Sequence, residues 1–334
     1  MAEIIPGIYQ LKVPIPFNPL EYTNIYLIKT DDGYLLVDAG VNTPEALQAV
    51  KRQLSEIRVD FKDISHIIIT HVHGDHYGLA GKLKELSGAK LAFHQLEKNQ
   101  IYPAYGNAID FFRQSDEWLK SNGIPDHELP LPQPTPSGEQ KFSPPALPDI
   151  TFQGGETIST GAVSLQVVWT PGHAPGHICL YDAQRRLFFA GDHILPVITP
   201  NISLRLPSAG NPLGDFINSL NKVKMFDVKL VLPAHEHIFS NLPARVEEII
   251  QHHRHRTGEM LDTLRTKPRT AYEMSADITW MPEFGGVKFH TMAPWDKRMA
   301  VSETLAHLEA LRLDGIISQF YRDSIIYYRR NQSK

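Results

Sequence analysis

Four residues that can bind metal ions lie within one six-residue stretch, His71-x-His73-x-Asp75-His76. Neutral imidazole and carboxylate groups suit zinc, iron, manganese and related divalent ions. Alternate residues of an extended turn can point the same way, so His71 and His73 can share one ion. Asp75 and His76 can then turn toward a second ion. The stretch directly follows the apolar run 64–70, which predicts a buried strand with a metal site at its end.

Three further candidate ligands, His173, Asp192 and His235, each come just after a strand-like run. Proteins with α/β folds often build a site from the loops at strand ends. The full set of five histidines and two aspartates exceeds what one tetrahedral zinc ion takes. It fits two ions if one carboxylate bridges them, and pairs of divalent ions about 3.5–4 Å apart recur in hydrolytic enzymes.

Charge arithmetic favours hydrolysis at such a centre. Two divalent ions, two aspartates and a hydroxide leave one net positive charge, which stabilises a developing oxyanion. The expected mechanism is attack by a hydroxide that bridges the ions. Asp75 is the candidate catalytic residue, because it can relay a proton toward the leaving group.

The elements that must position these residues alternate between strands and helices, which is typical of an α/β layer architecture. The predicted strands are residues 24–29, 34–38, 64–70, 89–93, 163–169, 178–181, 187–190 and 229–232. A helix is expected from Thr43, with Pro44 in its first turn, and another over residues 79–86.

Residues 99–150 interrupt this alternation. Their first half is helical in pattern, and the second half holds eight of the chain's 25 prolines. Such a long irregular segment is typical of a lid or of a surface excursion. We expect a helical cap over the metal site, and a packed surface excursion stays the alternative. The aromatic residues that would wall the cap are Tyr102, Tyr105, Phe111, Phe112 and Trp118.

Length and composition predict two domains, residues 1–240 and 241–334, in a chain of 334 residues. The single cysteine, Cys179, excludes an intrachain disulfide and a cysteine-based zinc cluster. Neither a secretory signal nor a long apolar span is recognisable, so a cytoplasmic protein without membrane contact is expected. No serine-hydrolase elbow and no P-loop motif is present.

The second predicted domain combines two long helical patterns, the later one over residues 297–313, with a terminal hairpin at 316–328. This order suggests a winged-helix module. Residues 241–334 carry 14 basic and 12 acidic side chains, far from the charge of a nucleic-acid module. The near-neutral balance favours packing or homo-oligomerisation over nucleic-acid binding.

The ordered blocks around these ligands resemble the metallo-β-lactamase-fold hydrolases over roughly residues 23–240. The blocks are Thr70-His71-Val72-His73-Gly74-Asp75-His76, Pro171-Gly172-His173, Gly191-Asp192 and Pro233-Ala234-His235. The resemblance implies a four-layer αββα sandwich with the site at one edge of its two sheets. It assigns one ion to His71, His73 and His173. It assigns the other to Asp75, His76 and His235, with Asp192 bridging. Residues 241–334 resemble the winged-helix extension of one branch, which includes members similar to an endoribonuclease.

These observations predict a hydrolase of an ester-like bond in a small molecule: a carboxylic ester, thioester or lactone. Two divalent ions are the expected cofactors, with zinc first and iron or manganese as alternatives. A phosphodiesterase or endoribonuclease with the same ions is the main rival. An iron-dependent dioxygenase is a further rival, disfavoured because His73 stands where a redox di-iron site would carry glutamate.

Other polar residues near the ligands are expected to have supporting roles. Asp38 either anchors the histidine loop or caps a turn. His177, His193 and His237 are expected to support the ligands rather than to bind metal. The run at residues 252–255 predicts a solvated helix face, and Cys179 a buried core position. Surface or packing positions are expected for His66, His94, His127, His290 and His307.

Overall fold

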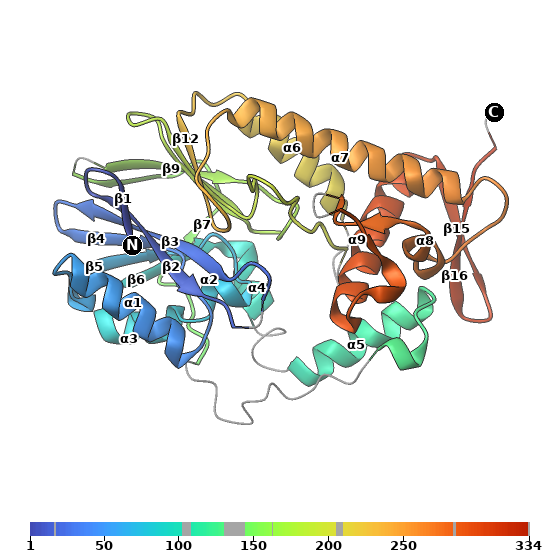
Figure 1. Ribbon diagram of the computed structural model, residues 1–334, viewed down its shortest axis with the longest axis horizontal. Helices are drawn as coiled ribbons and strands as arrows, with labels where there is room; N and C mark the ends of the chain where they lie inside the picture. The colour runs from blue at the N-terminus through green and yellow to red at the C-terminus, as the bar shows by residue number, and fades with distance from the viewer. Residues whose placement is uncertain are drawn as a thin grey trace.

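The computed structural model describes residues 1–16, 18–101, 108–129, 144–161, 163–204, 210–282 and 285–332. For residues 108–112 it describes the backbone alone. Two β-sheets lie face to face, with helices on their outer sides, and further helices and a hairpin form a separate unit beside them (Figure 1).

The first sheet has seven strands in the order in which they occur along the chain. They are β1 (Ala2–Ile5), β2 (Ile8–Pro14), β3 (Tyr22–Thr30), β4 (Gly33–Val37), β5 (Ile64–Ile68), β6 (Lys90–His94) and β7 (Ile150–Phe152). Neighbours from β1 to β4 pair antiparallel, and those from β4 to β7 pair parallel. The carboxyl ends of β4 and β5 therefore lie at the same edge.

The second sheet has the order β12-β11-β10-β9-β8. Its strands are β8 (Thr157–Thr160), β9 (Val163–Trp169), β10 (Ile178–Asp182), β11 (Leu187–Gly191) and β12 (Leu230–Pro233). Strands β9 and β11 both run antiparallel to β10, and β12 runs parallel to β11. The carboxyl ends of β9, β11 and β12 consequently share one edge.

Three apolar clusters separate four layers. One lies between α1 (Pro44–Glu56) and α3 (Ala80–Ser87) and the first sheet. A second lies between the sheets and contains Ile28, Val37, Leu165 and Phe189. A third lies between the second sheet and α6 (Pro212–Val223) with α7 (Leu242–Thr263). This is the predicted αββα order, because each sheet buries both of its faces.

Local sequence explains the first long helix. The Thr43 side chain accepts a hydrogen bond from the backbone N–H of Ala46, and Pro44 occupies the first helical turn. Its buried residues include Ala46, Val50 and Leu54, which recur at helical spacing toward the first sheet. The helix thus begins at the predicted residue.

Helix α7 connects the sandwich to the C-terminal unit. Val246 and Ile249 pack with the second sheet, whereas Met260 belongs to the C-terminal core. That unit adds α8 (Ala271–Asp277), β13 (Thr279–Trp280), β14 (Val287–Lys288), α9 (Pro294–Leu313) and the hairpin β15 (Ile317–Arg322) with β16 (Ile325–Arg330). The expected helices and terminal hairpin are present, and the winged-helix assignment and the domain limits stay predictions. No helix in the described ranges is both long and apolar enough to span a membrane.

The described part of the insertion packs against the C-terminal unit. Helix α5 (Ala108–Ser121) places Leu119 in the C-terminal core, with Trp118 against it, and Asp116 pairs with Arg298 of α9. Tyr102 and Tyr105 lie outside the described residues. The side chains of Phe111 and Phe112 are not described either. A cap over the metal site therefore stays a prediction.

The core between the sheets provides a test of this packing. Phe189 is 1% exposed and lies edge-to-face with Tyr26, with ring centroids 5.4 Å apart. We expect Phe189→Ala to lower the free energy of unfolding by about 3–5 kcal/mol, because it removes buried apolar surface and leaves a cavity. Denaturant unfolding measures this change. Met225→Ala, at an 83% exposed position, is the control. Equal losses in both variants would contradict the packing described here.

Candidate metal centre

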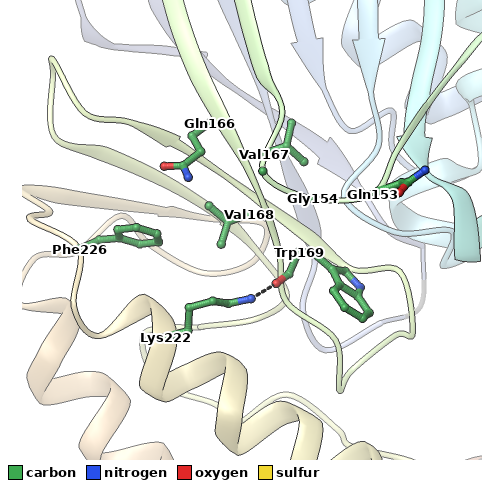
Figure 2. Close-up of a pocket in the computed structure, with 9 residues that line it drawn as sticks. Gln153, Gly154, Gln166, Val167, Val168, Trp169, Lys222 and Phe226 are labelled. Atoms are coloured by element: carbon green, nitrogen blue, oxygen red, sulfur yellow. Dashed lines mark hydrogen bonds between the residues drawn. The ribbon is translucent and has the colours of Figure 1, made fainter.

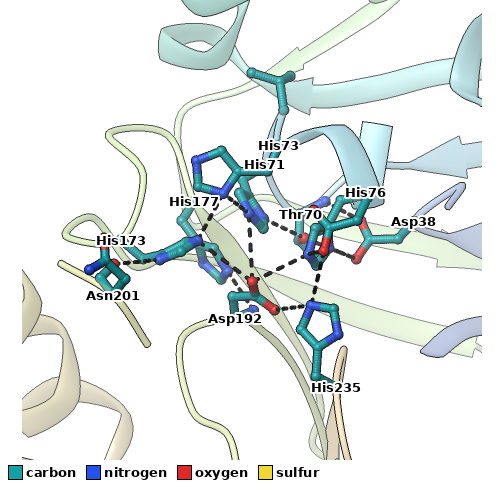
Figure 3. A network of polar contacts seen from close by, with 12 residues as sticks. Asp38, Thr70, His71, His73, His76, His173, His177, Asp192, Asn201 and His235 are labelled. Carbon is teal, nitrogen blue, oxygen red and sulfur yellow. Dashed lines mark hydrogen bonds and ion pairs between the residues drawn. The ribbon is translucent and has the colours of Figure 1, made fainter. Parts of the chain in front are cut away.

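All seven predicted ligands meet at the shared edge of the two sheets. Figure 3 labels six of them, all except Asp75. His71 and His73 follow β5, and Asp75 and His76 lie in the short helix α2 (Gly74–Tyr77). The remaining three ligands follow β9, β11 and β12, and they are His173, Asp192 and His235.

The first group consists of three histidine rings around one point. His73 Nδ1 lies 2.8 Å from His71 Nε2 and 2.9 Å from His173 Nε2. The outer nitrogen of His173 donates to the carbonyl of Asn201 at 2.8 Å. The outer nitrogen of His71 lies 3.1 Å from the hydroxyl of Thr70, which itself donates to a carboxylate. Both Nε2 atoms therefore present lone pairs to His73.

One hydrogen on His73 Nδ1 cannot satisfy two lone pairs. A cation between the three nitrogens satisfies all of them, because neutral imidazole is a ligand for divalent metals. The donor set of His71, His73 and His173 therefore fits a metal ion.

The second group combines a carboxylate with two imidazoles. His235 Nε2 lies 3.2 Å from Asp75 Oδ2, and His76 Nε2 lies 3.7 Å from the same oxygen. The outer nitrogen of His235 lies 3.2 Å from the carbonyl oxygen of Tyr22, to which it can donate. The inner nitrogens of His76 and His235 are buried without a hydrogen-bond partner among the described residues. In the neutral form of each ring, these nitrogens present lone pairs that converge on one point.

Asp192 lies between the two groups. Its Oδ2 is 3.3 Å from His76 Nε2 and 3.6 Å from His173 Nε2. Its Oδ1 is 3.4 Å from His235 Nε2. One carboxylate therefore contacts histidines of both groups.

The pKa shifts of the histidines show that the site favours bound positive charge. Burial disfavours a charged His76, yet Asp192, Asp75 and Asp38 together raise its pKa well above the usual value. Burial likewise opposes charge on His235, but the two aspartates beside it raise its pKa to about 10. Burial and the neighbouring histidines lower the pKa of His71 well below normal. The carboxylate side attracts cations, and the histidine side stays unprotonated.

Asp38 was expected either to anchor the histidine loop or to cap a turn, and its contacts show that it anchors the loop. Its carboxylate accepts from His76 Nδ1 at 2.9 Å and from the backbone N–H of Thr70 at 2.8 Å. The residue is 2% exposed and has a φ of 63°. By holding the His76 proton on Nδ1, Asp38 turns the Nε2 lone pair toward the centre.

Glu97 of α4 (Gln95–Ile101) joins two ligand loops, a role that the sequence analysis missed. Its carboxylate accepts from the backbone N–H of Val72 at 2.8 Å and from that of Gly176 at 2.7 Å. A Cβ at Gly176 would lie 2.8 Å from Glu97 Cγ, so only glycine allows this approach. The loops of His71 and His173 are thus fixed relative to each other by one buried side chain.

The three histidines expected to support the ligands differ from one another. His177 Nε2 accepts from the backbone N–H of Asp192 at 3.1 Å, so it positions that residue. His193 is fully buried, with its ring edge-to-face against Phe216. His237 is exposed. Among the described residues, none of the three belongs to a ligand group.

The C-terminal unit contacts the centre through one asparagine. The carbonyl of Asn201 accepts from His173 Nδ1, and its side chain donates to Glu303 Oε2 of α9 at 2.8 Å. The backbone N–H of Leu204 also donates to the carbonyl of Ser302 at 3.0 Å. Sequence patterns carry no signal for this link, because it joins residues about 100 positions apart.

The structure corrects one expectation about the other histidines. His253 was expected to be solvated with its neighbours, but it is 2% exposed, because its side of α7 faces α9. His307 is fully buried beside His253, which agrees with the packing position expected for it. His94 packs by stacking on Trp169. Cys179 is buried as predicted, and burial raises the pKa of its thiol to about 12.

A shallow cavity of about 250 Å³ lies between β9 and α6 (Figure 2). Lys222 crosses it and donates to the carbonyl of Trp169. None of the seven predicted ligands is among its lining residues. This cavity therefore does not belong to the metal centre.

The anchoring role of Asp38 predicts weaker metal binding in Asp38→Asn. Asparagine tolerates the positive φ but cannot hold the His76 proton as a carboxylate does. We expect the affinity for Zn²⁺ to fall about 10–100-fold, as is typical when a group behind a metal ligand is changed. Competition with a chromogenic chelator measures it. Asp32→Asn, in an exposed turn, is the control, and an unchanged affinity for Asp38→Asn would refute the role.

Glu97→Gln tests whether the Glu97 carboxylate holds the loops of His71 and His173 together. The amide keeps one acceptor oxygen and places an NH₂ group against a backbone N–H. We expect the free energy of unfolding to fall by about 1–3 kcal/mol, the cost of an unsatisfied buried donor. Thermal and denaturant unfolding are the measurements. Glu85→Gln, which alters an exposed pair with Lys82, should change little. Equal free energies of unfolding for Glu97→Gln and Glu85→Gln would show that Glu97 does not hold the two loops together.

Comparisons with known proteins agree with this geometry. The family model of the metallo-beta-lactamase superfamily matches residues 18–235. A probable metallo-hydrolase, YqjP of Bacillus subtilis, is 27% identical over 332 residues, covering 96% of each chain.

Two solved structures share the complete architecture. The metallo-beta-lactamase family protein TTHA1429 from Thermus thermophilus superimposes with a TM-score of 0.83 at 30% identity, covering 98% of this chain and 100% of that one. A beta-lactamase domain protein from Burkholderia ambifaria gives a TM-score of 0.79 at 25% identity, covering 99% and 94%. The chain therefore belongs to the metallo-beta-lactamase superfamily and is a metal-dependent hydrolase.

Proposed function

We propose that the chain is a dinuclear hydrolase that cleaves an ester-like bond: a carboxylic ester, a thioester or a lactone. The observation that carries the proposal is the place of Asp192, whose Oδ2 lies 3.3 Å from His76 Nε2 and 3.6 Å from His173 Nε2. A carboxylate that reaches both ligand groups suits two ions held side by side.

The donor sets support zinc first, with iron or manganese as alternatives. His71, His73 and His173 would hold one ion, and Asp75, His76 and His235 the other, with Asp192 shared. Such a pair of ions supplies a hydroxide at neutral pH and polarises the carbonyl that it attacks.

The chain's own residues provide the proton transfer. The side chain of Asp75 is 25% exposed, while those of His76 and Asp192 are 0% and 11% exposed. Asp75 is therefore the acidic group of the centre that solvent or a leaving group reaches most easily. We assign it the proton relay to the leaving group, with His235 holding its carboxylate at 3.2 Å.

Charge supports a small uncharged or weakly charged substrate over a nucleic acid. The chain carries a formal net charge of −4, and residues 241–334 have only two more basic than acidic side chains. A polyanion needs a basic field that this balance does not provide. Phosphodiester cleavage and iron-dependent oxygenation are the competing outcomes. We assign packing or dimerisation, rather than nucleic-acid binding, to the C-terminal unit.

The experiment combines metal analysis with a substrate panel. Protein prepared with excess zinc, iron or manganese is assayed for bound metal and for turnover of aryl esters, thioesters, lactones and a phosphodiester. We expect about two ions per chain and the highest kcat/KM among the first three substrates. Turnover confined to the phosphodiester would support the rival hydrolase, and oxygen consumption with iron alone would support an oxygenase.

Asp192→Asn is the matched variant for the dinuclear centre. Losing the shared carboxylate should reduce bound metal to one ion or fewer. It should also lower kcat/KM at least about 100-fold, because the metal pair contributes several kcal/mol to transition-state stabilisation. Asp227→Asn, at an exposed pair with Arg186, is the control. Near-normal metal content and turnover in Asp192→Asn would exclude the bridge.

A further inference from the structure

A second set of metal-ligating side chains lies between helices α7 and α9, apart from the seven residues described above. It consists of His253 on α7 and of Glu303 and His307 on α9. One ligand atom from each residue lies within 4.8 Å of the other two, and all three residues are buried. Glu303 precedes His307 by four positions, so one turn of α9 presents both on the same face.

The spacing of the two imidazoles matches that of ligands on one ion. His253 Nδ1 lies 3.3 Å from His307 Nε2. Two nitrogens bound tetrahedrally at zinc distances are about 3.4 Å apart. The pair is therefore already at the separation that a divalent ion requires.

Hydrogen bonding orients His307 toward this point. The hydroxyl of Thr257 donates to the carbonyl of His253 at 2.8 Å, so it accepts from His307 Nδ1, also at 2.8 Å. The lone pair of His307 is thereby placed on Nε2, opposite His253. Histidine ligands usually hold their outer N–H in this way.

The protonation states also suit a cation. Burial, helped by Arg256 and His252, lowers the pKa of His307 to about 3. Burial and His307 lower the pKa of His253 well below its usual value. Both rings are therefore neutral at pH 7, which is the form that binds metal.

The hydrogens of the two neutral rings can be arranged to fit a cation. His253 Nε2 is buried without a hydrogen-bond partner among the described residues, whichever of its two ring nitrogens carries the hydrogen. With that hydrogen on Nε2, His253 Nδ1 and His307 Nε2 present two facing lone pairs. A cation between the rings would use both.

Charge and access are compatible with an ion here. Arg256, the nearby cation, is paired with Glu259 at 3.4 Å and lies over the ring of Trp280 at 4.3 Å. The carboxylate of Glu303 supplies the negative charge. A cavity of about 220 Å³ between α6 and α7 is lined by His253 and Thr257, so one ligand of the cluster borders an open space.

We propose that His253, Glu303 and His307 form a third divalent-metal site, of the two-histidine, one-carboxylate type that suits zinc or ferrous iron. An ion there joins α7 to α9. Because Asn201 donates to Glu303 and accepts from His173, the same ion also stiffens the support behind one ligand of the main centre. The site does not depend on the proposed function.

The test counts zinc in four full-length proteins. Each is freed of metal, reconstituted with excess Zn²⁺, desalted and analysed by mass spectrometry for zinc per chain. We expect His253→Ala and His307→Ala each to bind one equivalent less than the unchanged protein. His252→Ala, the neighbouring position on α7, should bind the full amount. Equal stoichiometry in all four proteins overturns the proposal.

The test compares the zinc content per chain of each variant with that of the unchanged protein. If the main centre binds fewer ions than proposed, the zinc content of all four proteins falls equally. The difference of one equivalent between them remains. A zinc-edge anomalous map of crystals of the unchanged protein covers the case in which the alanine variants do not fold. We expect a peak about 2.0–2.2 Å from His253 Nδ1, His307 Nε2 and a Glu303 oxygen. A map with no peak at this cluster overturns the proposal equally.

Discussion

Imidazole lone pairs and carboxylates meet at one buried edge of the two sheets, and positive charge must compensate them. The contacts around the metal centre depend on this constraint. Imidazole nitrogens of His71, His73 and His173 face one another at hydrogen-bond distance with too few hydrogens. Beside them, Asp75 and Asp192 face the inner nitrogens of two further histidines. Such an arrangement is costly for the chain alone and favourable around cations.

The surrounding polar contacts act by keeping each ligand in the form that a cation needs. The Asp38 carboxylate accepts the outer hydrogen of His76. The carbonyl of Tyr22 accepts the outer hydrogen of His235, and the carbonyl of Asn201 accepts the outer hydrogen of His173. Glu97 adds a joint between two loops rather than a contact with a ligand ring. Metal affinity is consequently distributed over residues that never touch an ion.

The C-terminal unit contributes to the centre even though all seven predicted ligands come from the sandwich. Helix α7 packs on both cores, and Glu303 of α9 supports the residue behind His173. The described part of the insertion also packs there, through Leu119. The support behind His173 thus includes a part of the chain that is remote from it in sequence.

The candidate ligand set and the order of the elements can be read from the sequence. Residues 71–76 and the later strand-end ligands carry local signals, because a strand must end before a side chain can turn toward a site. Helix α1, capped by Thr43, and buried strand β5 were predictable for the same local reason. The layer order could be named only through a family resemblance.

Which distant groups meet depends on how the layers and the C-terminal unit pack. Glu97, Asn201 and Glu303 are ordinary polar residues in their local sequence, and their roles arise from neighbours up to about 100 positions away. The burial of His253 was not expected, because a polar stretch of helix gives no sign that another helix will cover it. Burial is a property of the assembled layers, and it keeps a histidine ring neutral and fixes its orientation.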